Sequence, residues 1–260
     1  MEKNMFIYDF LMFNDITLEI LIYLWLLLTI NLKKILRILI LIFSLSLLGC
    51  SGDSEEESEG IISYNVTYPD MDKSNFMFDF MPKKMELIFK DNKYITNLSA
   101  GMGLFKTSFL VDKNENEFSQ LVKLVDKKYI LSLKDEKVEE SLSRLPTFKI
   151  EHTGKKKNIL NYNCKKAIIT VNDNSNDTFS VFYTDQINLE TPNWCNQFKE
   201  IDGVMLEYQY EKYGICMRFT AQSIEFTKIN NSEFEIDEKY IPLSEEDIDK
   251  EMQEIFDSFK

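Results

Sequence analysis

Apolar and polar residues alternate with a period of two in many short segments after residue 60. The alternation is clearest in residues 204–210, 224–227 and 148–151. Successive side chains of a strand point to opposite faces of a sheet, so this period is typical of antiparallel strands that are buried on one face. We therefore expect a mainly β protein built on antiparallel strands.

Further segments have the length and the apolar pattern of strands, and polar turns separate them. Asp91-Asn92 and residues 172–177 are rich in side chains that hydrogen-bond their own backbone, which is typical of hairpin tips. The further strand candidates are residues 61–68, 85–89, 93–98, 103–111, 120–125, 129–133, 164–171, 178–183 and 215–221. We expect a single β-rich domain over residues 61–260, a length sufficient for one hydrophobic core.

The end of the chain has the pattern of an amphipathic helix. Ser244 is followed three residues later by Asp247, which makes a weak capping box, and the acids of this first turn favour the helix dipole. The apolar residues that follow share one stripe at helical spacing: Ile248, Met252, Ile255, Phe256 and Phe259. The stripe predicts a C-terminal helix that packs on the sheet or lies in a groove.

The N-terminal region has the pattern of a secretory signal. Basic residues within 33–37 precede an apolar run over residues 38–48, which is too short to cross a bilayer as a helix. Leu47-Leu48-Gly49-Cys50 resembles the lipobox of bacterial lipoproteins. This resemblance implies that Cys50 is acylated, for example with palmitate, and becomes the new N-terminus after residues 1–49 are removed. The alternative is an ordinary signal peptide with an incidental cysteine.

Residues 1–32 fit a signal peptide poorly, because residues 16–30 form a second apolar stretch ahead of the basic residues. A transmembrane helix is one interpretation, but the positive-inside rule would then place residues 33–37 in the cytoplasm. We prefer a start codon assigned too far upstream.

An acidic segment follows Cys50 and ends at Gly60. Such a polar stretch cannot bury apolar surface, so residues 50–60 are predicted to be a lipidated tether. The acidic run resembles the surface-export signal of outer-membrane lipoproteins in Bacteroidota, although Gly52 and Ser54 interrupt it. We expect an outer-membrane lipoprotein of the cell envelope, with its surface or periplasmic location left open.

The charge balance excludes polyanionic partners. The chain has 43 acidic and 30 basic residues, which gives a net charge of -13. Affinity for nucleic acid comes mainly from Lys and Arg that neutralise phosphates. We therefore expect no nucleic-acid partner, and a membrane partner only through the N-terminal lipid.

Four short motifs, in this order, resemble an uncharacterised family of Bacteroidota lipoproteins. They are residues 161–167 (NYNCKKA), 182–187 (FYTDQI), 203–208 (GVMLEY) and 234–240. The resemblance covers about residues 61–242 and implies the lipoprotein-carrier (LolA/LolB-like) fold, in which a curved antiparallel sheet forms a half-barrel that covers apolar ligands. The ligands of that family are unknown, so no site residue is carried over from it.

The sequence has no recognisable catalytic or metal site. His152 is the only histidine, and it shares a strand face with Phe148 and Ile150, which favours a packed or edge residue over a catalytic base. No nucleophile-elbow, calcium-loop or phosphate-binding glycine motif is present, and the cysteines are too far apart for a zinc site. We expect no enzyme activity, no cofactor and no metal.

Three cysteines follow Cys50, and in an oxidising compartment one disulfide and one free thiol is the simplest arrangement. We prefer a bridge between Cys195 and Cys216, with Cys164 free. All three thiols reduced is the alternative.

One segment is apolar on both faces and contains the candidate ligand-binding residues: Phe76, Met77, Phe78, Phe80 and Met81. Soft Met and aromatic side chains suit an adaptable binding wall, although a simply buried segment is the alternative. We expect a lipid-anchored, non-enzymatic module that binds an apolar ligand, such as a lipid or a hydrophobic peptide. The alternative function is a protein–protein interaction module of an envelope complex.

Overall fold

The computed structural model describes Tyr23, Trp25 and residues 58–72, 74, 76–173 and 177–257. The chain divides into one unit over Met1–Asp53 and a second over Ser54–Lys260, and the fold below is that of the second unit. Its elements are β1 (Glu59–Thr67), η2 (Phe76–Phe80), β2 (Lys84–Lys90), β3 (Lys93–Ala100), η3 (Gly101–Gly103), β4 (Phe105–Asp112), β5 (Glu117–Leu124), β6 (Lys127–Lys134), α2 (Glu136–Ser143), β7 (Thr147–Ile159), β8 (Tyr162–Asn172), β9 (Thr178–Thr184), β10 (Val204–Lys212), β11 (Ile215–Phe226), η4 (Asn231–Phe234), β12 (Ile241–Pro242) and α3 (Glu245–Asp257).

The strands form one sheet in the order β12-β6-β5-β4-β3-β2-β1-β11-β10-β9-β8-β7. The prediction of a mainly β protein is confirmed. The sheet is mixed rather than purely antiparallel, because Ile241 and Pro242 of β12 pair in parallel with Tyr129 and Ile130 of β6. It is not closed into a barrel, since β12 and β7 stand at its two ends.

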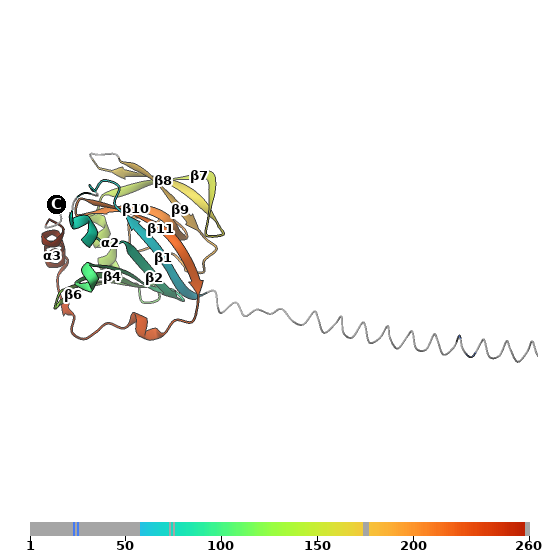
Figure 1. Ribbon diagram of the computed structural model, residues 1–260, viewed down its shortest axis with the longest axis horizontal. Coiled ribbons are helices and arrows are strands. Elements are labelled where there is room, and N and C mark those ends of the chain that lie inside the picture. Colours follow the sequence, from blue (N-terminus) through green and yellow to red (C-terminus); the bar gives the residue numbers. More distant parts are fainter. Residues whose placement is uncertain are drawn as a thin grey trace, which may run out of the picture. The chain divides into compact units, whose positions relative to one another are not determined.

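The sheet curves so that one face encloses the main core, with α2 between its two halves (Figure 1). The alternation seen in the sequence places residues on this inner face: Ile62, Tyr64 and Val66 of β1 are all buried. Leu87 and Phe89 of β2 continue the same row. Regular strands of this kind bury apolar side chains on one face and leave the opposite side chains partly exposed.

A segment after β11 covers part of the outer face. Ile229 packs there with Ile88 and Ile95 in a small separate cluster. The Glu59 carboxylate accepts a hydrogen bond from the Ile229 N–H at 2.9 Å and pairs with Lys90 at 3.1 Å. Glu59 is the first residue of β1 and pairs with Lys90 of β2, so the sheet begins inside the tether predicted over residues 50–60.

Two elements differ from the sequence pattern. β7 extends to Ile159 instead of ending near Glu151, because its lysine-rich half pairs with β8 through the backbone while its side chains stay exposed. The helix α2 has no counterpart among the predicted elements, since in this short polar segment only Val138 is fully buried.

The helix α3 begins after Ser244, whose Oγ accepts a hydrogen bond from the Asp247 N–H at 3.1 Å. Ile248 and Met252 are buried against the main core. The side chains of Ile255 and Phe256, and Phe259 as a whole, lie outside the described residues. Within the described part of the chain, no helix has the length and apolar character needed to cross a membrane.

Gly203 is required where the chain enters β10. Its φ is +141°, and a Cβ there would lie 2.4 Å from the Thr184 carbonyl oxygen of the neighbouring strand β9. The pairing of β10 with β9 shifts register two residues later, between Met205 and Glu207. A side chain at this position would therefore push apart two strands where the sheet is already irregular.

We expect Gly203→Ala to lower the free energy of unfolding by about 1–3 kcal/mol, because it adds both backbone strain and a clash. The matched control is Gly154→Ala, since a Cβ at Gly154 meets nothing within 4 Å. That control should lower the free energy by no more than about 0.5 kcal/mol. Urea unfolding of the full chain measures both, and equal losses would contradict the close approach at Gly203.

Candidate ligand-binding cavity

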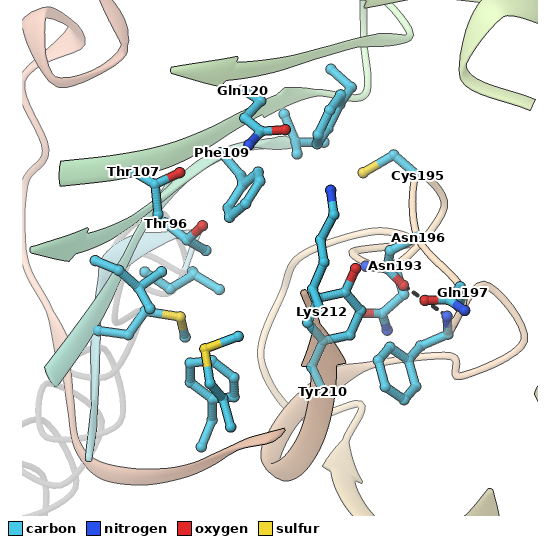
Figure 2. Close-up of a pocket in the computed structure, with 18 of the residues that line it drawn as sticks. Thr96, Thr107, Phe109, Gln120, Asn193, Cys195, Asn196, Gln197, Tyr210 and Lys212 are labelled. Carbon is cyan, nitrogen blue, oxygen red and sulfur yellow. Dashed lines mark hydrogen bonds between the residues drawn. The ribbon is translucent and has the colours of Figure 1, made fainter. Parts of the chain in front are cut away.

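A cavity of about 280 Å³ lies on the inner face of the sheet. Its walls come from β1 to β6, from β10 and β11, from the loop between β9 and β10, and from α2 and α3. Figure 2 shows Thr96, Thr107 and Gln120 on one side and Asn193 and the residues after it on the other. The cavity thus joins parts of the chain that are far apart in sequence.

Aromatic rings form much of the wall. Tyr208 stacks on Phe219 with ring centroids 4.8 Å apart, and Tyr64 meets Tyr208 edge to face at 6.2 Å. Buried tyrosines need a partner for the hydroxyl. Tyr64 donates to the Met205 carbonyl at 3.0 Å, and Tyr94 donates to the Pro192 carbonyl at 2.6 Å. Burial raises the pKa of both hydroxyls, so they remain neutral donors that connect the walls.

The loop between β9 and β10 is held in place by a buried amide. The Asn193 side chain donates to the carbonyls of Ile201 and Gly203, each at 2.9 Å. Asn193 is only 5% exposed, so its amide hydrogens need these acceptors. The loop therefore forms a fixed wall, with Cys195 facing Tyr94 at 3.9 Å between Sγ and the hydroxyl oxygen.

A small polar group lies on the sheet side of the cavity. The register places Thr96 and Gln120 on either side of Phe109, and Thr107 two residues before Phe109 on the same strand face. Thr107 and Gln120 are 7% and 4% exposed. The Thr107 hydroxyl oxygen is buried and has no hydrogen-bond partner among the described residues.

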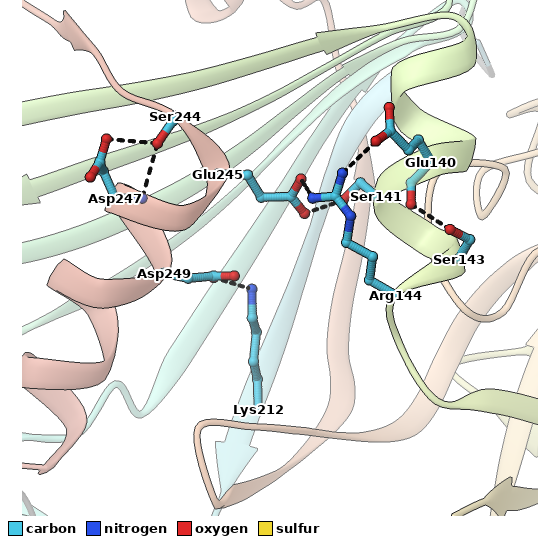
Figure 3. A network of polar contacts seen from close by, with 9 residues as sticks. All are labelled: Glu140, Ser141, Ser143, Arg144, Lys212, Ser244, Glu245, Asp247 and Asp249. Atoms are coloured by element: carbon cyan, nitrogen blue, oxygen red, sulfur yellow. Dashed lines mark hydrogen bonds and ion pairs between the residues drawn. The ribbon is translucent and has the colours of Figure 1, made fainter.

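Charged side chains gather where α3 covers the cavity. Glu245 accepts from the Arg144 guanidinium at 2.9 Å and from the Ser141 hydroxyl, which connects α3 to α2 (Figure 3). Asp249 pairs with Lys212 at 3.2 Å and accepts from the Tyr213 hydroxyl. Burial and then the bond to Asp249 raise the pKa of Tyr213, so this hydroxyl stays protonated as a donor.

The candidate ligand-binding residues of the sequence are only partly brought together. Met81 is buried and lines the cavity. Phe78 is half-buried and packs edge to face on Tyr68, whereas Phe80 is 46% exposed. The side chains of Phe76 and Met77 lie outside the described residues.

The predicted bridge between Cys195 and Cys216 is not formed, and Cys164, Cys195 and Cys216 are buried free thiols. The physical reason is that the thiols occupy different surroundings: Cys195 faces Tyr94, while Cys216, the second residue of β11, lies close to the Asp70 carboxylate. Burial raises the pKa of Cys195 to about 11 and is the main cause that raises that of Cys216 to about 12.

The remaining sequence candidates lie away from the cavity or outside the described residues. His152 is an exposed residue of β7, and its Nδ1 lies 2.9 Å from the Tyr183 hydroxyl. Cys50 is outside the described residues. The described part of the chain holds no group of three or more His, Cys, Asp or Glu side chains that could bind a metal ion.

The polar wall is the part of the site that the sequence analysis missed. Thr107 and Gln120 occupy inward positions of their strands, where alternation calls for apolar residues. Polar residues at such positions are the signal that could have found them. That signal is weak, because isolated threonines are common in strands.

The raised pKa of Cys195 predicts a pH effect on stability. A folded-state pKa of about 11 lies above the reference value of 9.0, so the stability contribution is complete below pH 9 and is lost as the pH rises toward 11. We expect the free energy of unfolding of the unsubstituted chain to fall about 2 kcal/mol further than that of Cys195→Ala between pH 9 and pH 11. Denaturant unfolding at several pH values measures this difference, and parallel pH profiles would refute it.

The contacts between α2 and α3 predict how a substitution at Glu245 changes the stability of α3. Glu245→Gln weakens a charge-assisted bond to Arg144, so we expect it to cost about 0.5–1 kcal/mol and to speed hydrogen exchange in α3. Glu246→Gln is the matched control, because Glu246 is an exposed acid in the same first turn. Hydrogen exchange followed by mass spectrometry compares the two, and equal exchange would show that Glu245 does not hold α3.

The LolA/LolB-like family resemblance is wrong, because the chain matches a different family. The four motifs that suggested it coincide with features that many sheets need: residues 161–167 begin with Asn161 at a positive φ in a hairpin turn, and residues 203–208 begin with the close-packed Gly203. Such features repeat in unrelated β proteins and carry little family information.

Comparison with known families finds one match, over residues 80–242, to the family described as N-glycanase peptide, N-terminal domain. The matched region runs from η2 to β12 and includes the loop between β9 and β10. Comparison with curated proteins finds no match. The chain therefore belongs to the family of N-glycanase peptide N-terminal domains.

Proposed function

We propose that this protein is a non-enzymatic binding module whose curved sheet holds an apolar ligand, such as a lipid or a hydrophobic peptide side chain. In this proposal the sheet acts as a half-barrel, and the C-terminal helix α3 covers its open side. The observation that carries the proposal is the cavity of about 280 Å³ on the inner face of the sheet.

The size of the cavity supports a small ligand. Natural ligand pockets are commonly about 300–1,000 Å³. An engineered apolar cavity of about 150 Å³ is enough to bind benzene. A volume of about 280 Å³ is therefore suited to a short acyl chain or a fused aromatic ring system. Tightly packed protein cores contain few voids larger than a water molecule, so a cavity of this size is unusual.

The charged residues around the cavity support binding more than catalysis. Glu245 is engaged by Arg144 and Ser141, and Asp249 is engaged by Lys212. A general acid or base needs a proton position that is free to reach a substrate. The family name refers to N-glycanases, and for this chain we propose a binding role that is separate from bond cleavage.

We also propose that the module is attached to the cell envelope through a lipid on Cys50. The support is the sequence alone, where an apolar run over residues 38–48 is followed by Gly49 and Cys50. Two or more acyl chains give stable attachment, and the acidic residues after Cys50 would hold the domain away from the bilayer surface.

The edge strand β7 favours a second candidate function, a protein–protein interaction module of an envelope complex. Among the strands that the structure describes, β7 is at the end of the sheet and pairs with β8 alone, so one edge of its backbone can accept a partner strand. Lys155, Lys156 and Lys157 lie on this strand, and lysines on an edge oppose unspecific pairing. A partner strand would therefore need acidic side chains.

The binding proposal predicts that the full chain binds pyrene, an apolar fluorescent probe. Binding is measured by the change in the vibronic bands of pyrene fluorescence that follows transfer of the probe out of water. Leu98→Trp fills the cavity from β3 and should weaken pyrene binding by about tenfold or more. Ser99→Trp is the control, because Ser99 is exposed on the opposite face of the same strand. If both variants bind pyrene like the unsubstituted chain, the cavity is not the site.

A further inference from the structure

We infer that the cavity selects a neutral amphiphile, a small apolar body with one uncharged hydroxyl or amide group that hydrogen-bonds to Thr107 and Gln120. This inference rests on the proposed function and identifies its ligand class. Its basis is the buried, unpartnered hydroxyl of Thr107, which lies on the sheet wall of a largely apolar cavity.

Thr107 gives the first part of the argument. Its side chain is more than nine-tenths buried and lines the cavity, and its hydroxyl oxygen has no hydrogen-bond partner in the described part of the chain. A buried hydroxyl without a partner costs about 1–3 kcal/mol. Valine has nearly the same shape and would avoid that cost, so the hydroxyl is a donor and acceptor kept available for a bound molecule.

Gln120 and Thr96 add further hydrogen-bonding groups beside the Thr107 hydroxyl. Both belong to the same wall, on the strands that flank β4, and Figure 2 shows them on the side of the cavity where Thr107 lies. Gln120 is 4% exposed, and its amide offers both a donor and an acceptor. Together the three side chains can satisfy a hydroxyl or an amide, each of which donates and accepts.

The charges around the cavity exclude an ionised head group from this wall. Lys212 is the only basic residue among those that line the cavity, and it is paired with Asp249 at the α3 side. The other charged lining residues are Glu245 and Asp249, acids that would repel a carboxylate or phosphate. An anion buried against threonine and glutamine would have to compete with Asp249 for Lys212, the one basic lining residue, and an unpaired charge is costly in a largely apolar site.

The aromatic rings of the remaining wall favour an apolar group for the rest of the ligand. Phe109 lies between Thr96 and Gln120, and stacks on Phe118 with ring centroids 6.1 Å apart. Across the cavity, Tyr208 and Phe219 form a second stacked pair. The polar group of a ligand would be held at the sheet while its apolar body contacts these rings.

The test uses the full chain loaded with pyrene, which has no hydrogen-bonding group, and three competitors of the same chain length. We expect 1-octanol and octanamide to displace pyrene at concentrations about tenfold lower than octanoate at pH 8, where octanoate is ionised. Displacement by octanoate at the same concentration as the neutral compounds, or a lower one, would overturn the inference.

Substitutions locate the effect at the polar wall. Thr107→Val and Gln120→Met should each weaken the binding of 1-octanol and octanamide by about 3- to 10-fold. The affinity for pyrene should stay within about twofold of that of the unsubstituted chain. Thr107→Val should also raise the melting temperature, because it removes an unsatisfied hydroxyl, and this readout shows that the variant folds. Thr67→Val is the control on an exposed position of β1 and should change neither affinity.

The outcomes separate the two proposals. In one outcome, Leu98→Trp abolishes pyrene binding, all competitors displace pyrene equally and Thr107→Val has no effect on their binding. This result would support the apolar binding function and refute the neutral-amphiphile inference. Pyrene binding that Leu98→Trp leaves unchanged would refute the binding function at this cavity and the inference with it.

Discussion

The structure depends on the need of one large sheet to cover its own apolar face. Every strand from β1 to β6 carries large apolar side chains on the inner face, and the described residues form no second sheet that packs on them. The sheet therefore bends, and α2, α3 and the loop before β10 close the space that remains. Irregular pairing in β1, β10 and β7 accompanies this bending, since bulges increase local twist. A cavity remains because helices and a loop cover a curved sheet less completely than a second sheet would.

The buried polar groups inside this enclosure are of two kinds, those with a hydrogen-bond partner and those without one. The hydroxyls of Tyr64 and Tyr94 and the amide of Asn193 are bonded to backbone carbonyls on other elements, so each holds two walls together. Thr107 is of the second kind, since its hydroxyl is also buried and has no hydrogen-bond partner among the described residues. Groups of the first kind explain the stability of the enclosure, and a group of the second kind indicates where a ligand would complete it.

Family membership and cavity chemistry give complementary information. The match over residues 80–242 covers most of the strands that form the walls, together with α2. It leaves out β1 and α3, although Tyr64 of β1 and Met252 of α3 line the same cavity. The site therefore depends on elements at both ends of the described unit, and ion pairs with Arg144 and Lys212 connect α3 to it.

The sequence by itself determined the secondary structure wherever a local period was strong, as in residues 204–210 and at the capped start of α3. It did not reveal α2 or the lysine-rich half of β7, because exposed backbone pairing leaves no apolar period. Short motifs at hairpin turns and strand ends misled the family assignment, since backbone constraints of that kind recur across folds. Only the tertiary structure decided the strand order, the free state of the three buried thiols and the meeting of Thr96, Thr107 and Gln120 on one wall. The strand order and the surroundings of the thiols depend on contacts between segments distant in sequence. The shared wall depends on the register of β3, β4 and β5, which side-chain packing across the sheet sets rather than any one segment.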